Sequence, residues 1–250
     1  LLSLIRIPVF RRMWAAITFS SLGDWLGLLA NTALAQQLTR TSSVATQGVA
    51  ISGVILVRLA PDLVLGPFAA ALADKFDRRK TVIVGETLAG VLYLSIAFGY
   101  ELVWLYVAQF LIEAAGLFTS PAKQVIWTNI IPKKLLATAN QVSLISVYGT
   151  VPVAAAIFAL LSTLNRFIGK PSQQLAPGHV NIAIFVALVL DAFTFFISAS
   201  TVFVSRRLIP AFTGKRERGQ SIFSLITEGV AFVRQNVLIQ VEHVRRQPCL

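Results

Sequence analysis

The chain has 250 residues, of which 56% are hydrophobic and only 13% are charged, and its formal net charge is +11. Soluble domains are about a quarter charged, so this much apolar surface exceeds one soluble core and predicts an integral membrane protein. The single cysteine, Cys249, excludes an intrachain disulfide framework, and the two histidines, His179 and His243, form no metal-ligand cluster.

Six long apolar segments follow one another along the chain, each close to the ~20 residues that a membrane-spanning helix requires. They are Met13–Ala35, Val44–Leu65 (continuing to Ala73), Thr81–Gly99, Leu102–Phe118, Gln141–Leu164 and Val180–Val204. The longest connections are Ser120–Asn140 and Asn165–His179, and the glycines and prolines of the second predict irregular structure there. We therefore predict an all-α integral membrane fold in which residues 1–205 form a six-transmembrane-helix bundle.

Lysine and arginine are distributed unevenly between the two sides that this arrangement defines. With the amino terminus inside, the inside segments up to Arg218 contain fifteen of these residues and the outside segments contain three, Arg40, Arg166 and Lys170. Translocated short loops disfavour both residue types, so the asymmetry predicts a multi-pass protein of the cell membrane with a cytoplasmic amino terminus. The positive charge then reflects topology and attraction to membrane lipid, and we expect no nucleic-acid partner because no basic face carries base-reading or stacking groups.

Ionisable residues within the spans cost ~2.5–3.5 kcal/mol each at the bilayer centre unless they are paired or hydrated. Asp24 lies about eleven residues into the first span and Arg58 about fifteen residues from the inner end of the second, so both fall near the midplane. We predict an Asp24–Arg58 ion pair that faces the bundle interior, with Asp62, one turn from Arg58, as a competing partner. The pair either fixes helix packing or includes Asp24 as a proton or substrate site.

A basic hairpin joins the second and third spans. Residues 66–82 read Gly-Pro-Phe-Ala-Ala-Ala-Leu-Ala-Asp-Lys-Phe-Asp-Arg-Arg-Lys-Thr-Val. This segment resembles the loop between helices 2 and 3 of the major facilitator superfamily, G-x-L-A-D-[RK]-x-G-[RK]-[RK], with Ala70 and Asp77 in place of the two glycines. The sequence D-[RK]-F-D-R-R resembles the motif that is typical of the macrolide-efflux-like branch of drug:proton antiporters.

The resemblance implies a gating role for this loop, whose matching polar residues are Asp74, Lys75, Asp77, Arg78 and Arg79. In the superfamily the aspartate at the position of Asp74 helps to latch the two halves of the carrier together on the inner side. The alternative is a loop that only sets topology, which requires the cations but not the acid.

Superfamily members have twelve helices in two halves, and each half consists of two inverted three-helix repeats. The resemblance covers about residues 1–235 and implies the amino-terminal half, so the expected partners are a small-molecule substrate and the missing carboxy-terminal half or a second copy. Residues 206–250 are predicted to be a cytoplasmic basic linker, truncated before helix 7, in which Ser221–Arg234 has the spacing of an amphipathic helix.

Three further acidic residues lie within the predicted spans. Glu113 stands in the region of the fourth span where many proton-coupled superfamily members carry an arginine, and Asp191 belongs to a stretch of the sixth span that resembles the macrolide-efflux-like branch. Either could carry a proton or be held by hydrogen bonds between helices. Glu86 lies nearer the inner surface, and we expect it to pair with the cations of Arg78–Lys80.

The fifth span carries part of a motif that antiporters of the superfamily use to kink this helix, G-x-x-x-G-P-x-x-G-G. Pro152 and the following small residues are present, but the glycines are lost except for the nearby Gly149. Proline removes a helical hydrogen bond and small residues permit close packing, so we predict a kink at Gly149 and Pro152.

The function that these patterns favour is secondary transport, namely proton-coupled efflux of small amphipathic molecules, with no cofactor. No phosphate-binding loop, G-x-S-x-G or H-E-x-x-H motif is present, which argues against an enzyme within these residues. An alternative arises from residues 21–38, which also resemble transporter-like domains fused to a thymidylate kinase in some actinobacteria. In that case this half would be a membrane anchor or regulatory module. A half-transporter that works as a homodimer is a third possibility.

Overall fold

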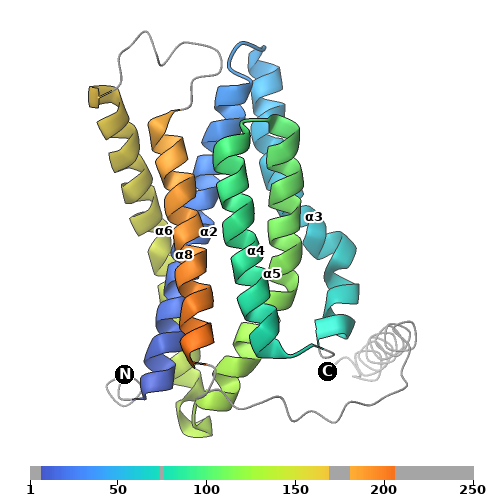
Figure 1. Cartoon of the computed structure of the whole chain (residues 1–250), viewed down its shortest axis with the longest axis vertical. Coiled ribbons are helices and arrows are strands. Elements are labelled where there is room, and N and C mark those ends of the chain that lie inside the picture. Colours follow the sequence, from blue (N-terminus) through green and yellow to red (C-terminus); the bar gives the residue numbers. More distant parts are fainter. Residues whose placement is uncertain (1–6, 74–75, 169–180, 206–250) are drawn as a thin grey trace, which may run out of the picture.

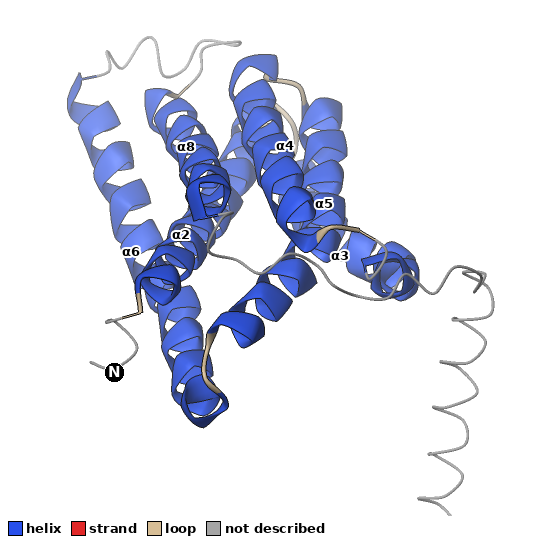
Figure 2. Ribbon diagram, turned by 60° about the horizontal axis from the view of Figure 1, so that its bottom comes forward, coloured by secondary structure: helices blue, strands red, loops and turns tan. Residues whose placement is uncertain are grey.

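The computed structural model of the chain describes residues 7–73, 76–168 and 181–205, and within these ranges it describes the side chains except those of 67–73, 129–130, 166 and 168. The described residues form six long helices and one short 3-10 turn (Figures 1 and 2). These are α2 (Pro8–Leu38), α3 (Val44–Ala73), α4 (Arg78–Gly99), α5 (Leu102–Ile130), η1 (Lys133–Leu135), α6 (Leu136–Ile168) and α8 (Ile182–Val204). The all-helical prediction is confirmed for this part of the chain.

Five of the helices are long and apolar enough to cross a membrane, namely α3, α4, α5, α6 and α8. The remaining long helix, α2, falls short because polar residues recur along it. Three of them, Ser20, Ser21 and Asn31, are buried in the bundle rather than turned to lipid. A helix face that packs against other helices does not have to be apolar. The mean hydropathy of α2 is therefore a poor guide to how much of this helix is buried in the bundle.

The helices pack as one bundle in which α2 contacts α8, α6 and α3, while α4 contacts α8 and α5, and α3 contacts α5. Glycines permit the closest approaches. A Cβ atom at Gly90 of α4 would lie 2.9 Å from ring atoms of Phe196 and 3.1 Å from the Ala192 carbonyl oxygen, both of α8. The main apolar core lies between these helices and includes the stacked rings of Tyr93 and Phe195, whose centroids are 5.4 Å apart.

The helices extend beyond the predicted spans at the end of the bundle where α2 begins. The connection expected at Ser120–Asn140 is mostly helical, because α5 continues through Pro121 to Ile130 and α6 begins at Leu136. A second core cluster stabilises this extension, with Phe10 of α2 against Trp127 of α5 at a ring-centroid distance of 4.9 Å. Buried aromatic pairs of this kind stabilise the packing beyond the apolar area that they bury.

Several predictions fall on residues that the structure does not describe. They are Asp74 and Lys75 of the basic hairpin, most of the connection between α6 and α8, and the linker at 206–250 with its expected amphipathic helix.

Candidate functional site

A chain of polar contacts runs through the middle of the apolar bundle. Asn31 of α2 donates through Nδ2 to Oε1 of Gln109 on α5 at 2.5 Å, and Gln109 Nε2 donates to Oε1 of Glu113 at 2.8 Å. The same Glu113 oxygen lies 3.3 Å from Nε of Arg58 on α3. Arg58 Nη1 completes the chain by donating to the backbone carbonyl of Asp24 on α2, at 3.3 Å. These contacts join α2, α3 and α5. They give the polar side chains the hydrogen-bond partners that the surrounding apolar residues cannot offer.

The predicted ion pair between the side chains of Asp24 and Arg58 is therefore wrong. In the described residues the ion pair of Arg58 is with Glu113, and the contact with Asp24 is to the main chain rather than to the carboxylate. Asp62, the competing candidate, is exposed and forms no ion pair with Arg58 in this part of the chain. Helix rotation explains the outcome, because α3 packs chiefly on α5 and turns Arg58 towards that helix.

The central ion pair is accessible. The side chains of Arg58 and Glu113 are 23% and 24% exposed, respectively. A charged pair that is partly exposed can exchange a proton or contact a polar group of a bound molecule.

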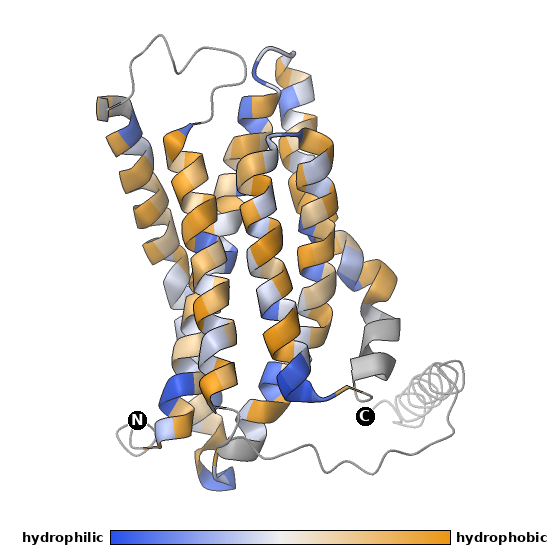
Figure 3. Cartoon of the chain, in the orientation of Figure 1, coloured by the Kyte–Doolittle hydropathy of each residue, from blue (hydrophilic) through white to orange (hydrophobic). Residues whose placement is uncertain are grey.

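The pair lies in apolar surroundings. Figure 3 shows that the helices are hydrophobic along most of their length, while hydrophilic residues gather at the ends and reappear partway along α2.

A second polar group lies nearer the end of the bundle where α2 begins. Lys123 Nζ on α5 is 2.8 Å from Oε1 of Glu86 on α4, and it also donates to Oγ of Ser20 on α2 at 3.0 Å. The expected pairing of Glu86 with the cations of Arg78–Lys80 is thus replaced by a pair with Lys123. Sequence reasoning assigned Lys123 to a connecting segment. The sequence up to residue 130 is apolar and, apart from Pro121, compatible with a helix. This signal could have placed Lys123 in a helix.

Asp191 of α8 is fully buried, and neither of its carboxylate oxygens has a hydrogen-bond partner among the described residues. The carboxyl group lies in a notch formed by Gly23 and Gly27 of α2, where a Cβ atom at either position would overlap its oxygens. Tyr93 of α4 closes the same notch, since that Cβ at Gly27 would lie 2.8 Å from its ring. An ionised carboxylate without a donor is unfavourable in such a place.

The basic hairpin contributes one described contact. Asp77 accepts a hydrogen bond at Oδ1 from the backbone amide of Arg79 at 3.0 Å and so caps the amino terminus of α4. This accounts for aspartate at a position where the superfamily motif has glycine, because an N-cap acceptor satisfies an amide that the helix leaves free.

The predicted kink residues lie within an uninterrupted helix. Pro152 is inside α6, and both Gly149 and Pro152 are exposed. A Cβ atom at Gly149 would have no neighbour within 4 Å among the described residues, so no helix approaches it closely in this structure.

The chain matches a family model described as a transmembrane secretion effector of the major facilitator type, over residues 2–169. It is similar to an MFS-type transporter of Bacillus subtilis, YfiS, whose function is uncharacterized. The two are 29% identical over 93% of this chain and 52% of the relative. An uncharacterized MFS-type transporter of Mycobacterium tuberculosis is 27% identical over 88% of this chain and 48% of its own length.

A third relative is BacE of Bacillus subtilis, which is provisionally named a bacilysin exporter. It is 24% identical over 75% of this chain and 43% of its own length. The chain thus spans about half the length of the curated relatives that it matches. Among solved structures there is no significant match.

Proposed function

Because the chain belongs to the transmembrane secretion effector family of the major facilitator superfamily, we propose that it is the amino-terminal half of a proton-coupled exporter. Its substrates would be small amphipathic molecules. The members of this family are membrane transporters and not enzymes. The observation that carries the proposal is the partly exposed Arg58–Glu113 pair within an otherwise apolar bundle.

The way in which Glu113 is held supports proton coupling. One oxygen of Glu113 serves both Arg58 and Gln109, so protonation of this carboxylate would weaken both contacts at once. Release of Arg58 would then free a cation near Asp24 on α2. Asp191 is the second candidate, because its buried carboxyl group is better tolerated when it carries a proton. Binding and loss of a proton at these sites would thereby change contacts between helices.

The helix neighbours support six spans arranged as two three-helix repeats. When α2, α3 and α4 are exchanged with α5, α6 and α8, the contact of α2 with α6 corresponds to that of α5 with α3. The contact of α2 with α8 likewise corresponds to that of α5 with α4, and the contact of α4 with α8 maps onto itself. With the basic residues inside, this arrangement has a cytoplasmic amino terminus.

The remaining half, or a second copy, is the partner that we propose for this chain. Large apolar side chains are exposed on α3 and α6, among them Leu59, Leu63, Ile145 and Tyr148. Part of this surface would face lipid and part would face the partner. The basic hairpin, with Asp74 as its acid, would form the inner latch between the halves. The comparisons give no support to the alternative of a module fused to thymidylate kinase.

A transport assay with the full-length gene product tests this function. Proteoliposomes would be loaded with ethidium or rhodamine 6G, and dye movement would be followed with and without an imposed pH gradient. We expect the gradient to accelerate transport, Glu113→Gln to remove that acceleration, and Glu101→Gln, at an exposed carboxylate outside the spans, to leave it unchanged. Dye movement that ignores the gradient in the wild type, or normal coupling in both Glu113→Gln and Asp191→Asn, would refute the proposal.

A further inference from the structure

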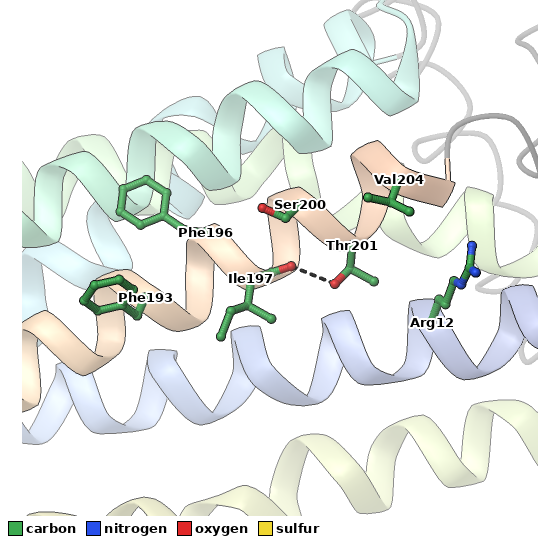
Figure 4. A pocket seen from close by; sticks show the side chains of 7 residues that line it. All are labelled: Arg12, Phe193, Phe196, Ile197, Ser200, Thr201 and Val204. Carbon is green, nitrogen blue, oxygen red and sulfur yellow. Dashed lines mark hydrogen bonds between the residues drawn. The ribbon is translucent and has the colours of Figure 1, made fainter.

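A groove of about 450 Å³ runs along the second half of α8, from Phe193 to Val204. Figure 4 shows its lining side chains, six from α8 and one, Arg12, from the beginning of α2. The residues are Arg12, Phe193, Phe196, Ile197, Ser200, Thr201 and Val204. We propose that this groove binds an anionic phospholipid from the membrane leaflet on the amino-terminal side of the bundle.

The length of the groove matches one leaflet. Its α8 residues extend from Phe193 to Val204, and the eleven steps between these twelve residues cover about 16 Å at ~1.5 Å per residue. The hydrocarbon core of a bilayer is ~30 Å thick, so one leaflet contributes ~15 Å. A groove that begins at the end of a transmembrane helix and ends at its middle therefore has the depth of one acyl chain layer.

The polarity of the groove changes along this length in the sense that a lipid requires. Arg12 lies at the end of the bundle beside Val204 (Figure 4), and the hydroxyl residues Ser200 and Thr201 come next. Deeper in the groove the lining is apolar, with Ile197 and Phe193 both exposed. The Thr201 hydroxyl donates to the Ile197 carbonyl at 2.7 Å, which satisfies this polar group within the helix and leaves the deep part of the groove suited to an acyl chain.

Arg12 is suited to an anionic headgroup. It is exposed, and in residues 7–73, 76–168 and 181–205 no carboxylate forms an ion pair with it. It also lies close to the amino terminus of α2, whose first turn contains no acidic residue. The positive end of the helix dipole disfavours a cation there, so an external anion would be favourable both to the arginine and to the helix. A lipid phosphate supplies that anion at the depth of the membrane surface.

The floor of the groove is formed by packing between α8 and α4 and does not require a bound ligand. Phe196 lies over Gly90 of α4, where a Cβ atom would come within 2.9 Å of its ring. The absence of a side chain at Gly90 lets the ring lie down against α4 instead of standing out into the groove. The groove is thus open before a lipid arrives, which reduces the ordering cost of binding.

A photo-crosslinking experiment tests the site independently of the transport function. The purified protein would be reconstituted in nanodiscs of phosphatidylcholine that contain a trace of phosphatidylglycerol with a diazirine on its acyl chain. After irradiation, peptide mapping would locate the cross-links. We expect cross-links on α8 between Phe193 and Val204, and a lower yield from the matching phosphatidylcholine probe.

Two pairs of variants provide matched controls. Arg12→Gln should lower the phosphatidylglycerol yield on α8 about five-fold, the weight of one arginine at an anionic lipid surface, whereas Arg11→Gln, which removes a neighbouring exposed charge outside the groove, should not. Ile197→Trp should reduce cross-linking by both probes by filling the groove. Leu190→Trp is its control, since Leu190 is similarly exposed (40% against 42%) but does not line the groove.

Equal yields from the two lipid probes, or equal effects of Arg12→Gln and Arg11→Gln, would overturn the proposal. Unchanged cross-linking on α8 in Ile197→Trp would overturn it as well. Thermal unfolding of each variant separates lost binding from lost folding. If Arg12→Gln failed to fold, Arg12→Lys would replace it, and the expected result would be retention of the phosphatidylglycerol preference.

Discussion

Replacement of Glu113 with glutamine tests which carboxylate balances the partly buried charge of Arg58. Arg58 Nε lies 3.3 Å from Glu113 Oε1, whereas its contact with Asp24 is to a backbone carbonyl that no side-chain substitution removes. Loss of one partner of a fully buried ion pair costs ~3–5 kcal/mol. Because both side chains are about a quarter exposed, solvent screening lowers the expected cost of Glu113→Gln to ~1–3 kcal/mol. Asp24→Asn should cost less than ~1 kcal/mol.

The free energy of unfolding would be measured by titration with SDS in mixed micelles, with tryptophan fluorescence as the signal. The double substitution Glu113→Gln with Arg58→Gln should recover most of the loss, because it leaves no uncompensated charge. The coupling energy between the two positions should then be ~1–3 kcal/mol. A larger cost for Asp24→Asn than for Glu113→Gln, or additive effects in the double variant, would show that Glu113 is not the counter-charge.

Three further predictions concern packing, topology and gating. Gly27→Ala should destabilise the protein by ~1–3 kcal/mol, because its Cβ would overlap the Asp191 carboxyl group and come too close to the Tyr93 ring. Asp191→Ala in the same chain should recover part of the lost thermal unfolding midpoint, and no recovery would show that the Asp191 carboxyl group is not the main clash. Ser43→Cys should react with an impermeant thiol reagent added to intact cells and Thr213→Cys should not, and the reverse pattern would invert the proposed topology. Asp74→Asn should lower transport by the full-length protein about ten-fold while membrane abundance stays normal, and an equal loss of abundance would contradict a latch.

The membrane character of this chain could be predicted from sequence because hydropathy is a property of composition and needs no knowledge of neighbours. The segments from Val44 onwards that were predicted as spans coincide with helices that are long and apolar enough to cross a membrane. The basic hairpin similarly pointed to the superfamily, to which the family match assigns the chain. Sequence also identified Asp24, Arg58, Glu113 and Asp191 as costly residues within apolar segments, since a charge in such a segment stands out without any structure.

Only the tertiary structure decided which of these residues meet. A helix that is apolar on nearly all sides gives no sign of the face that it turns to each neighbour, and each residue rotates the direction of its side chain by about 100°. Arg58 could therefore be placed at its depth but not in its direction, and it is the packing of α3 on α5 that brings it to Glu113. The same reason explains Lys123, because only the extension of α5 beyond Pro121 carries its ammonium group to Glu86. The depth of a residue in the membrane can be predicted from its position along the helix. The residue that it contacts depends on how the helix is rotated, and that rotation is determined by the packing of all the helices together.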